Sequence, residues 1–338
     1  MKLLVTGGAG FIGSSFVRMA LTEGWAERVV NFDKLTYAGN LENVAPVAEH
    51  VGYRFVQADI CDAAAVENVL REETPDAIVH FAAESHVDRS IHSPAPVVQT
   101  NIHGTFTLLE AARRLKIGRF VHISTDEVYG SIKAPHEADE NYPLHTSSPY
   151  SASKAGSDLL ALSYFTTYQM NVSVTRASNN YGPYHFPEKL IPLMISNALE
   201  DKPLPVYGDG QQVRDWLYVE DHCRAIKSVL EKGRAGEVYN VGGNCSLANL
   251  EVVKRILRAT GKPERLITRV ADRPGHDRRY ALTNAKLTRE TGWQPQMDFE
   301  RGLQATVQWY IRNKPWVERV KSGDYRKFYE LNYSKRAG

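Results

Sequence analysis

Tyr150 and Lys154 stand four positions apart in the segment YSASK. On a helix, side chains at this spacing lie on one face. A free tyrosine has a pKa near 10, so only ~0.1% of it is ionised at neutral pH. A lysine ammonium on the same face favours the phenolate. We interpret Tyr150 as the base that takes a proton from a substrate hydroxyl and Lys154 as the group that assists it. An ordinary amphipathic helix would also produce this spacing.

Two neighbouring carboxylates, Asp126 and Glu127, follow a β-branched run that ends at Thr125. In a continuing strand these side chains would point to opposite faces, so they share a site only if the chain turns. A carboxyl group that donates a proton at neutral pH needs a raised pKa, which a nearby carboxylate and a dry pocket supply. The pair therefore predicts an acid and a base that act on one substrate. The alternative is a solvated acidic turn.

Three glycines, Gly7, Gly10 and Gly13, come directly after the first apolar run and before a helical stretch. Glycines at this point let the backbone approach a pyrophosphate, whose charge is met by free N–H groups at the helix start. The next apolar run ends at Asp33, which can accept hydrogen bonds from an adenosine ribose and would repel a 2′-phosphate. The pattern predicts bound NAD. The alternative is a tight turn whose following loop is capped by Asp33.

Smaller signals accompany the glycine loop. Asp59 ends the third apolar run, where it could reach an adenine or serve as the N-cap of the helix expected from residue 62. Ala82 and Ala83 follow the fourth run and are small enough to let a cofactor pass. Neither signal is specific by itself.

Alternating elements must position these groups. Apolar, β-branched runs predict strands at residues 2–7, 28–33, 53–59, 76–82, 119–125 and 171–178. Helical periodicity is expected between them, at 11–23, 62–72, 96–115 and 150–169. Continuous apolar runs that alternate with helices indicate an α/β fold, in which a doubly wound parallel sheet carries helices on both faces.

The alternation of strand-like and helical segments becomes less regular after about residue 180. The segments PYHFPEKLIP and VYGDGQQ are rich in proline and glycine, and helices are expected near 220–232, 248–260 and 299–312. We predict an NAD-binding domain over residues 1–180, which carries the catalytic residues. Residues 181–338 are predicted to be mainly a smaller substrate-binding lobe, some segments of which return to the first domain.

Composition narrows the function classes. The 338 residues include 41 basic and 39 acidic side chains, mixed along the chain, which makes nucleic acid an unexpected partner. No segment approaches the ~20 apolar residues that span a bilayer, and the N-terminal segment is too rich in glycine for a signal peptide. Cys61, Cys223 and Cys245 form neither a disulfide framework nor a zinc motif, so a cytoplasmic location without a metal is expected.

Taken together, the motifs resemble those of the extended short-chain dehydrogenase/reductase family. The likeness rests on GGAGFIG at 7–13, STDEVYG at 124–130, YSASK at 150–154, NNYGP at 179–183 and RPGH at 273–276. It covers nearly the whole chain and implies a Rossmann-type fold. The Thr125-Asp126-Glu127 triplet is similar to that of the family's nucleotide-sugar 4,6-dehydratases, whereas the related epimerases do not carry this acid pair.

The resemblance implies a reaction of three stages on a hexose carried by a nucleoside diphosphate. Tyr150 and Lys154 would support oxidation at C4, with Thr125 near the C4 oxygen. Glu127 would then take the C5 proton, while Asp126 would protonate the departing C6 hydroxyl. Return of the hydride to C6 would leave a 4-keto-6-deoxy sugar and regenerate tightly bound NAD.

The resemblance also implies sets of contacts. The expected cofactor contacts are Gly7, Gly10, Phe11, Ile12, Gly13, Asp33, Lys34, Asp59, Ile60, Ala82, Ala83, Ser85, Thr100, Tyr150, Lys154 and Asn180. The expected substrate contacts are His86, Thr125, Asn179, Lys189, Leu190, Pro205, Tyr207, Arg214, Asn249, Arg273 and His276. Arginine guanidinium groups bind diphosphates well, although either arginine could instead be a surface ion-pair residue, Arg214 having Asp215 beside it. Finally, the helices at 96–115 and 150–169 are expected to form a four-helix homodimer contact.

The sequence is compatible with several functions. The resemblance favours glucose on thymidine diphosphate, but a uridine-linked hexose differs by one methyl group, worth only ~1 kcal/mol of burial. A C4 epimerase or decarboxylase would use the same cofactor and Tyr/Lys pair. A protein of another class, an NAD-sensing scaffold, could share the fold, although the intact catalytic residues disfavour it.

Overall fold

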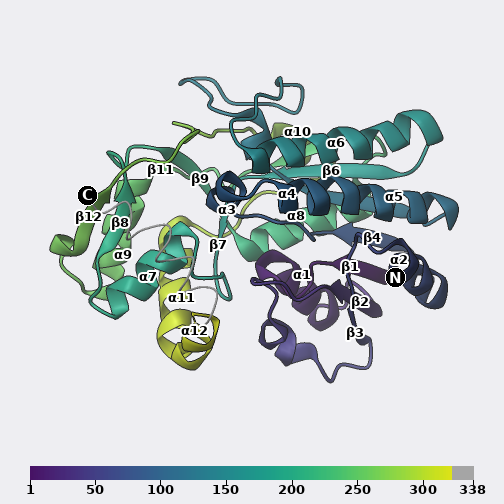
Figure 1. Cartoon of the computed structure of the whole chain (residues 1–338), viewed down its shortest axis with the longest axis horizontal. Helices are drawn as coiled ribbons and strands as arrows, with labels where there is room; N and C mark the ends of the chain where they lie inside the picture. Colours follow the sequence, from purple (N-terminus) through teal and green to yellow (C-terminus); the bar gives the residue numbers. More distant parts are fainter. Residues whose placement is uncertain (322–338) are drawn as a thin grey trace.

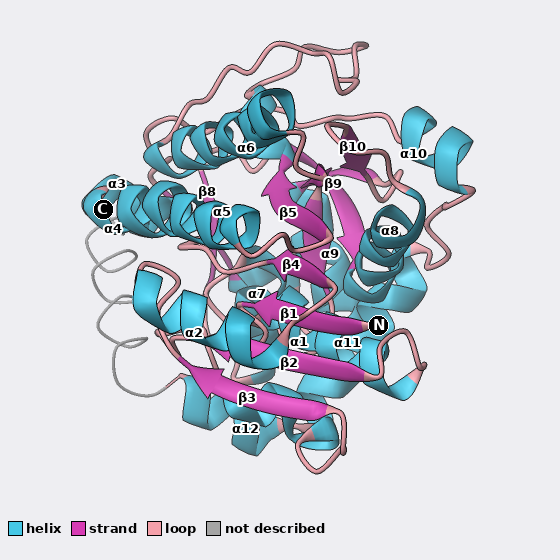
Figure 2. Ribbon diagram, turned by 90° about the vertical axis from the view of Figure 1, so that its right-hand side faces the viewer, coloured by secondary structure: helices cyan, strands magenta, loops and turns pink. Residues whose placement is uncertain are grey.

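The computed structural model describes residues 1–321. Seven parallel strands form its central sheet in the order β10-β6-β5-β4-β1-β2-β3 (Figure 2). Six are the predicted ones: β1 (Lys2–Thr6), β2 (Arg28–Asp33), β3 (Tyr53–Gln57), β4 (Ala77–His80), β5 (Arg119–Thr125) and β6 (Val172–Ala177). The predicted parallel sheet is therefore confirmed.

The seventh strand, β10 (Val238–Val241), was not predicted. It is fully buried and pairs with β6 at the edge of the sheet, where Asn240 lies opposite Arg176. Its four residues stand in the less regular part of the sequence after residue 180, so only its pairing with β6 reveals it.

Helices cover both faces of this sheet (Figure 2). On one face lie α2 (Ala63–Glu73), α5 (Thr105–Arg114) and α6 (Pro149–Tyr168), and on the other lie α1 (Phe11–Thr22) and α8 (Val219–Lys232). The alternating side chains of β1 show the division, because Leu3 packs in the core beneath α1 and Leu4 in the core beneath α2. These five helices agree with the predicted helical segments within a residue or two, except that α5 covers only the second half of 96–115.

The first half of that segment is divided. It contains α4 (Ala95–Val97) and then a wider π-helical stretch, η2 (Val98–Gly104), that continues into α5. Such stretches within a helix are frequent at functional sites. Here the wider turn contains Thr100, one of the predicted cofactor contacts, and Thr100 faces the cavity described below.

A second group of elements lies beside the sheet (Figure 1). It contains two small sheets, β11-β9-β7 and β12-β8, formed by β7 (Asn179–Tyr181), β8 (Leu204–Tyr207), β9 (Val213–Tyr218), β11 (Ser246–Ala248) and β12 (Ile267–Val270). Its helices are α7 (Leu190–Leu199), α9 (Asn249–Thr260), α11 (Phe299–Arg312) and α12 (Lys314–Val320), which share a third apolar core. The predicted helices at 248–260 and 299–312 are confirmed, whereas α7 and the short strands were not predicted.

The remaining short elements are η1 (Leu41–Val47), α3 (Val87–His92), η3 (Asp126–Tyr129), η4 (Glu264–Leu266) and α10 (Ala285–Thr291). Although α8 and β10 follow residue 180, they pack with the large sheet. The domain boundary at residue 180 stays a prediction, and residues 322–338 of the predicted lobe lie outside the described part. No helix within residues 1–321 has both the length and the apolar composition needed to cross a bilayer.

Candidate active site

The candidate site lies at the carboxyl ends of the parallel strands. The chain runs outward from β1 to β2 and β3, and β4 then continues on the other side of β1, which makes a switch point of the kind where α/β sheets bind ligands. A cavity of about 420 Å³ opens there and extends toward α7, β8 and β9. Every cofactor, catalytic and substrate residue predicted from the sequence lines this cavity.

The glycine loop between β1 and α1 forms one wall. Gly7 has a φ of +71°, and its N–H donates to the carbonyl of Phe32 on the neighbouring strand. Gly13 lies so close to the loop that an added Cβ would stand 2.2 Å from the carbonyl oxygen of Gly7. Only glycine fits at these positions, so the backbone comes as close to the cavity as a pyrophosphate requires.

The substitution Gly13→Ala is expected to abolish NAD binding, because the new methyl group must push the Gly7 carbonyl out of the loop. Calorimetric titration of the cofactor-free protein with NAD would measure the loss. Gly24→Ala is the control for general destabilisation, since its φ of +69° disfavours alanine but nothing lies within 4 Å of its added Cβ, so it should leave NAD binding intact. Tight NAD binding by the Gly13→Ala variant would contradict this role of the glycine loop.

Asp33 lies where it can both cap the following loop and contact a ribose, the two alternatives left open by the sequence. Its Oδ1 accepts a hydrogen bond from the N–H of Leu35 at 2.8 Å, so it does cap the following loop. Its Oδ2 accepts from the N–H of Ala9 at 2.9 Å and ties that loop to the glycine turn. The carboxylate also lines the cavity, where its remaining lone pairs can accept from a ribose.

Asp59 does not cap the following helix. The N-cap of α2 is Asp62, whose side chain accepts from the N–H groups of Ala64 and Ala65. Asp59 instead lies 2.6 Å from the ammonium of Lys34. The N-cap interpretation of Asp59 is therefore wrong. Both members of this ion pair line the cavity, and the residues around the glycine loop fit a dinucleotide.

The predicted turn after Thr125 is confirmed. Strand β5 ends there, and the chain enters the short helix η3, whose N-cap is Thr125. Thr125 Oγ1 accepts from the N–H of Glu127 at 3.2 Å and donates to Asp126 Oδ1 at 3.3 Å. Both carboxylates line the cavity. Asp126 is only 3% exposed, and burial, followed by the charge of Glu127, raises its pKa well above the usual range.

The helix that carries Tyr150 and Lys154 is α6. Ser148 and Ser151 form a reciprocal cap at its start, which places Tyr150 in the first turn. Lys154 Nζ is buried and donates to the carbonyl of Ile123 on β5 at 2.7 Å. Burial lowers the pKa of Lys154 to about 8. In the protein by itself, burial and then the charge of Glu127 raise the pKa of Tyr150, so its predicted lowering depends on the positive nicotinamide and stays a prediction.

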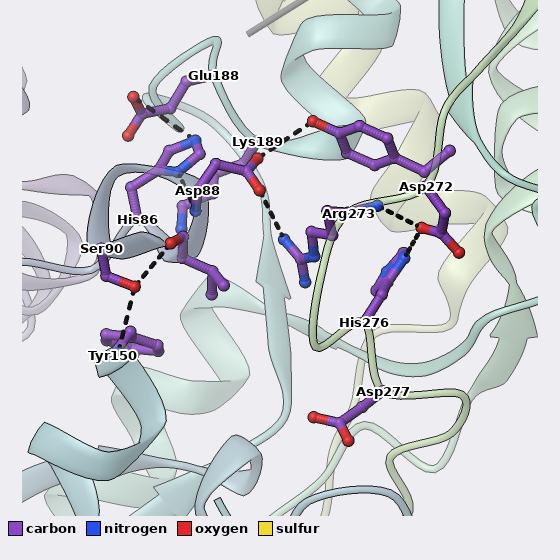
Figure 3. Close-up of polar contacts among 12 residues, drawn as sticks. His86, Asp88, Ser90, Tyr150, Glu188, Lys189, Asp272, Arg273, His276 and Asp277 are labelled. Atoms are coloured by element: carbon purple, nitrogen blue, oxygen red, sulfur yellow. Dashed lines mark hydrogen bonds and ion pairs between the residues drawn. The ribbon is translucent and has the colours of Figure 1, made fainter. Parts of the chain in front are cut away.

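Basic and aromatic side chains form the other end of the cavity (Figure 3). Asp88, on the short helix α3, lies 3.5 Å from the guanidinium of Arg273 and accepts from the hydroxyl of Tyr207 at 3.2 Å. The ring of His276 lies 2.6 Å from the carboxylate of Asp272, and burial lowers its pKa to about 4. Contacts across the cavity thus join α3 to the loop after β12.

Arg214 is not paired with Asp215. It donates to the carbonyl of Asp277 at 2.9 Å and stacks over the ring of Tyr280, 4.1 Å from the centroid. Asp215 accepts from the backbone N–H groups of Gly243 and Cys245. The surface ion-pair alternative is wrong, because neighbours on β9 point to opposite sides. Arg214 instead faces the cavity.

Buried polar atoms in this part of the cavity fit a polar ligand. Within residues 1–321, Asn179 Oδ1, Asn249 Oδ1 and Arg273 Nε are buried and have no hydrogen-bond partner. A buried polar group without a partner costs about 1–3 kcal/mol. Three such groups around one cavity are expected where a bound molecule completes their hydrogen bonds.

Among the polar residues of the same cavity that sequence reasoning missed are Glu188, His222 and Tyr280. Burial raises the pKa of Glu188, and its neighbour Lys189 donates to the carbonyl of Ser85 at 2.6 Å. Glu188 could have been predicted from the Glu-Lys pair that it forms within the proline-rich segment. His222 and Tyr280 gave no such signal, because they lie inside ordinary helical and loop sequence.

The chain matches a known family over most of its length. The family model described as GDP-mannose 4,6 dehydratase matches residues 4–306. The chain belongs to the GDP-mannose 4,6 dehydratase family. A member from Shigella flexneri, named dTDP-glucose 4,6-dehydratase, is 54% identical and covers 99% of this chain and 100% of its own length.

Solved structures of relatives agree with this assignment to the GDP-mannose 4,6 dehydratase family. A dTDP-glucose 4,6-dehydratase from Streptomyces venezuelae, crystallised with NAD bound, matches with a TM-score of 0.93 and 52% identity, covering 95% of this chain and 100% of that one. A UDP-glucose 4-epimerase from Thermus thermophilus, in complex with NAD, has a TM-score of 0.86 and 32% identity, covering 93% and 100%. The expected Rossmann-type family fold is confirmed, and the dehydratase is the more similar of the two.

Proposed function

We propose that this chain is an NAD-dependent dTDP-glucose 4,6-dehydratase, which converts dTDP-glucose to dTDP-4-keto-6-deoxy-glucose in the synthesis of deoxysugars. The observation that carries the proposal is the turn at η3, where Asp126 and Glu127 line the same cavity as Tyr150. Oxidation at one carbon needs only the tyrosine and lysine. Removal of water from the neighbouring carbons also needs an acid and a base, and this turn supplies both.

The first stage is assigned to the Tyr/Lys helix. Bound NAD supplies a hydride acceptor for C4 of the sugar and later a hydride donor for C6. Tyr150 takes the proton of the C4 hydroxyl, and Thr125 orients the C4 oxygen. Lys154 lies one helical turn after Tyr150 and is held by its hydrogen bond to the Ile123 carbonyl. The charge of Lys154 favours the ionised form of Tyr150.

The elimination is assigned to the acid pair. A carbonyl group at C4 makes the C5 proton acidic, and Glu127 removes that proton. Asp126 protonates the C6 hydroxyl, which leaves as water. The raised pKa of Asp126 keeps its carboxyl group protonated at higher pH than an exposed aspartate, as a proton donor requires.

The predicted contacts form two ends of one binding site. The glycine loop, Asp33 and Thr100 hold the dinucleotide. Arg214 and Arg273 bind the substrate diphosphate, with Asn179 and Asn249 among the polar groups that a ligand completes. A nucleotide-sugar substrate of this kind suits the cavity, because guanidinium groups recognise phosphate oxygens by paired hydrogen bonds.

Substrate turnover tests the proposal directly. The purified protein is expected to turn over dTDP-glucose faster than UDP-glucose or GDP-mannose, with the 4-keto product detected by its absorbance in alkali. Conversion of the sugar to its C4 epimer would favour the epimerase alternative. Absence of turnover with every nucleotide hexose, despite NAD binding, would favour an NAD-sensing scaffold.

We also propose that the protein is a cytoplasmic homodimer. Helices α5 and α6 pack against each other on one face of the sheet (Figure 2). The stretch η2, which begins at Val98, leads directly into α5. Phe106, Leu159 and Val98 are 43%, 58% and 51% exposed, so this face carries apolar side chains that a monomer leaves in water. A second copy related by a two-fold axis would cover them in a four-helix contact. The unpaired cysteines suit a reducing compartment.

The double substitution Phe106→Glu and Leu159→Glu is expected to convert the dimer into a monomer, because four buried carboxylates would oppose the contact. Light scattering coupled to size-exclusion chromatography measures the change. Val51→Glu is the control, since Val51 is 93% exposed and lies in a turn before β3. A wild-type monomer, or an unchanged dimer in the double variant, would contradict this interface.

A further inference from the structure

A buried series of hydrogen bonds joins η3, which carries Asp126 and Glu127, to α6, which carries Tyr150 and Lys154. Arg176, on β6, donates from Nε to Asp158 Oδ2 at 2.9 Å and from Nη1 to the hydroxyl of Tyr129 at 3.0 Å. The Tyr129 hydroxyl donates in turn to Asn240 Oδ1 on β10 at 2.7 Å. Each of these four residues is at most 3% exposed.

Two members of this series lie on the elements that carry the chemistry. Asp158 follows Lys154 by four residues on α6, so the two side chains share a helix face. Tyr129 is the last residue of η3, the short helix that begins with Asp126 and Glu127. Residues Asp158, Arg176 and Tyr129 are called the catalytic bridge from here on.

We propose that the catalytic bridge is a positioning device, in which Arg176 and Tyr129 hold the Asp126-Glu127 turn in register with the Tyr150-Lys154 helix. The inference rests on the dehydratase function proposed above. None of the three bridge residues lines the cavity, so the bridge acts on the substrate only through the residues that it holds.

Energetics favour positioning over simple stabilisation. A buried ion pair costs so much desolvation that well-packed apolar residues often give equal or greater stability. Buried hydrogen bonds, by contrast, restrict how the elements that they join can be arranged, and three of them join α6, β6, η3 and β10 here, although Asp158 Oδ1 makes none within residues 1–321. Burial raises the pKa of Tyr129 to about 12, so its hydroxyl keeps its proton and remains a donor to Asn240 at neutral pH.

The need for such a device follows from the local structure. Helix η3 is a single turn of four residues, and a helix this short depends on tertiary contacts for its stability. A misplacement of about 1 Å in a catalytic group can lower a rate by about 10²-fold. The hydroxyl of Tyr129 provides the turn with two fixed points on neighbouring strands, Arg176 on β6 and Asn240 on β10, which lie opposite each other in the sheet.

The substitution Tyr129→Phe removes the hydroxyl and little else. Oxidation of the sugar should stay within about 2-fold of wild type, because Tyr150 and Lys154 keep their helix, while elimination slows by about 10-fold or more. Reduced nicotinamide should therefore accumulate during a single turnover with dTDP-glucose, as an absorbance that wild type does not show. In the cofactor-free protein, amide hydrogen exchange should become faster in residues 126–130.

Two further variants complete the experiment. Tyr142→Phe is the matched control, because the Tyr142 ring packs edge-on against Tyr129 without belonging to the bridge. Arg176→Lys keeps a charge for Asp158 but cannot reach both partners, and it should reproduce the slow elimination even if the Tyr129→Phe variant folds poorly.

The outcomes separate this inference from the proposed function. If wild type dehydrates dTDP-glucose and both bridge variants slow oxidation and elimination equally, or slow neither, the positioning role is overturned. If wild type does not dehydrate dTDP-glucose, the proposed function fails instead, and only unchanged hydrogen exchange in residues 126–130 then overturns the bridge.

Discussion

The Glu127→Gln variant is expected to form the dehydrated product about 10²–10⁴ times more slowly than wild type while still oxidising the sugar. Glutamine keeps the shape of the side chain but cannot accept the C5 proton. Tyr150 and Lys154 stay in place on α6, so the first proton and hydride transfers continue. The absorbance of reduced nicotinamide should therefore rise and persist when the variant meets dTDP-glucose.

The control for this prediction is Glu137→Gln, a change at an exposed carboxylate in the loop after η3, which should leave both steps unchanged. Exchange of the C5 proton with deuterated solvent gives a second measurement, and it should stop in the Glu127→Gln variant. Product formation close to the wild-type rate, or loss of nicotinamide reduction together with dehydration, would remove Glu127 from the role of base.

The Lys154→Met variant should lose activity and gain stability at the same time. The pKa of Lys154 falls from 10.5 to about 8 because the ammonium is buried. The difference of about 2.5 pKa units corresponds to a cost of about 3 kcal/mol for keeping the charge in the folded state at pH 7. Methionine removes that cost, while dehydration falls by about 10²-fold or more because the tyrosine loses its cationic neighbour.

The pH dependence of this stability difference has a definite sign. Between pH 8 and 10.5 the unfolded chain carries more protons at Lys154 than the folded protein does, so wild-type stability rises with pH in this window. The advantage of the Lys154→Met variant should therefore be complete at pH 7 and should shrink as the pH rises through this window. Urea unfolding of both proteins at several pH values measures it.

A matched control is Lys232→Met. Lys232 also donates to a carbonyl, that of Thr291, but it lies at the end of α8 outside the cavity. This change should alter neither activity nor the pH dependence of unfolding. A Lys154→Met variant that is less stable than wild type at pH 7 would show that the hydrogen bond to Ile123 outweighs the desolvation of the ammonium.

The sequence by itself determined the local elements and the chemistry available to them. Six strands and most helices of the large sheet were predictable, because each apolar run is long enough to show its own period. The glycine loop was predictable because only glycine permits the approach that Gly7 and Gly13 make. The turn at Asp126 was predictable because adjacent carboxylates can share a site in no other way.

Only the tertiary structure decided which of these groups meet and in what charge state. Strand β10 exists through its pairing with β6. Arg214 faces the cavity rather than Asp215, because neighbouring residues of β9 lie on opposite sides of the strand. Burial raises the pKa of Asp126 and lowers that of Lys154. Such effects arise between residues distant along the chain, because desolvation and hydrogen bonding depend on what the folded protein packs around each group.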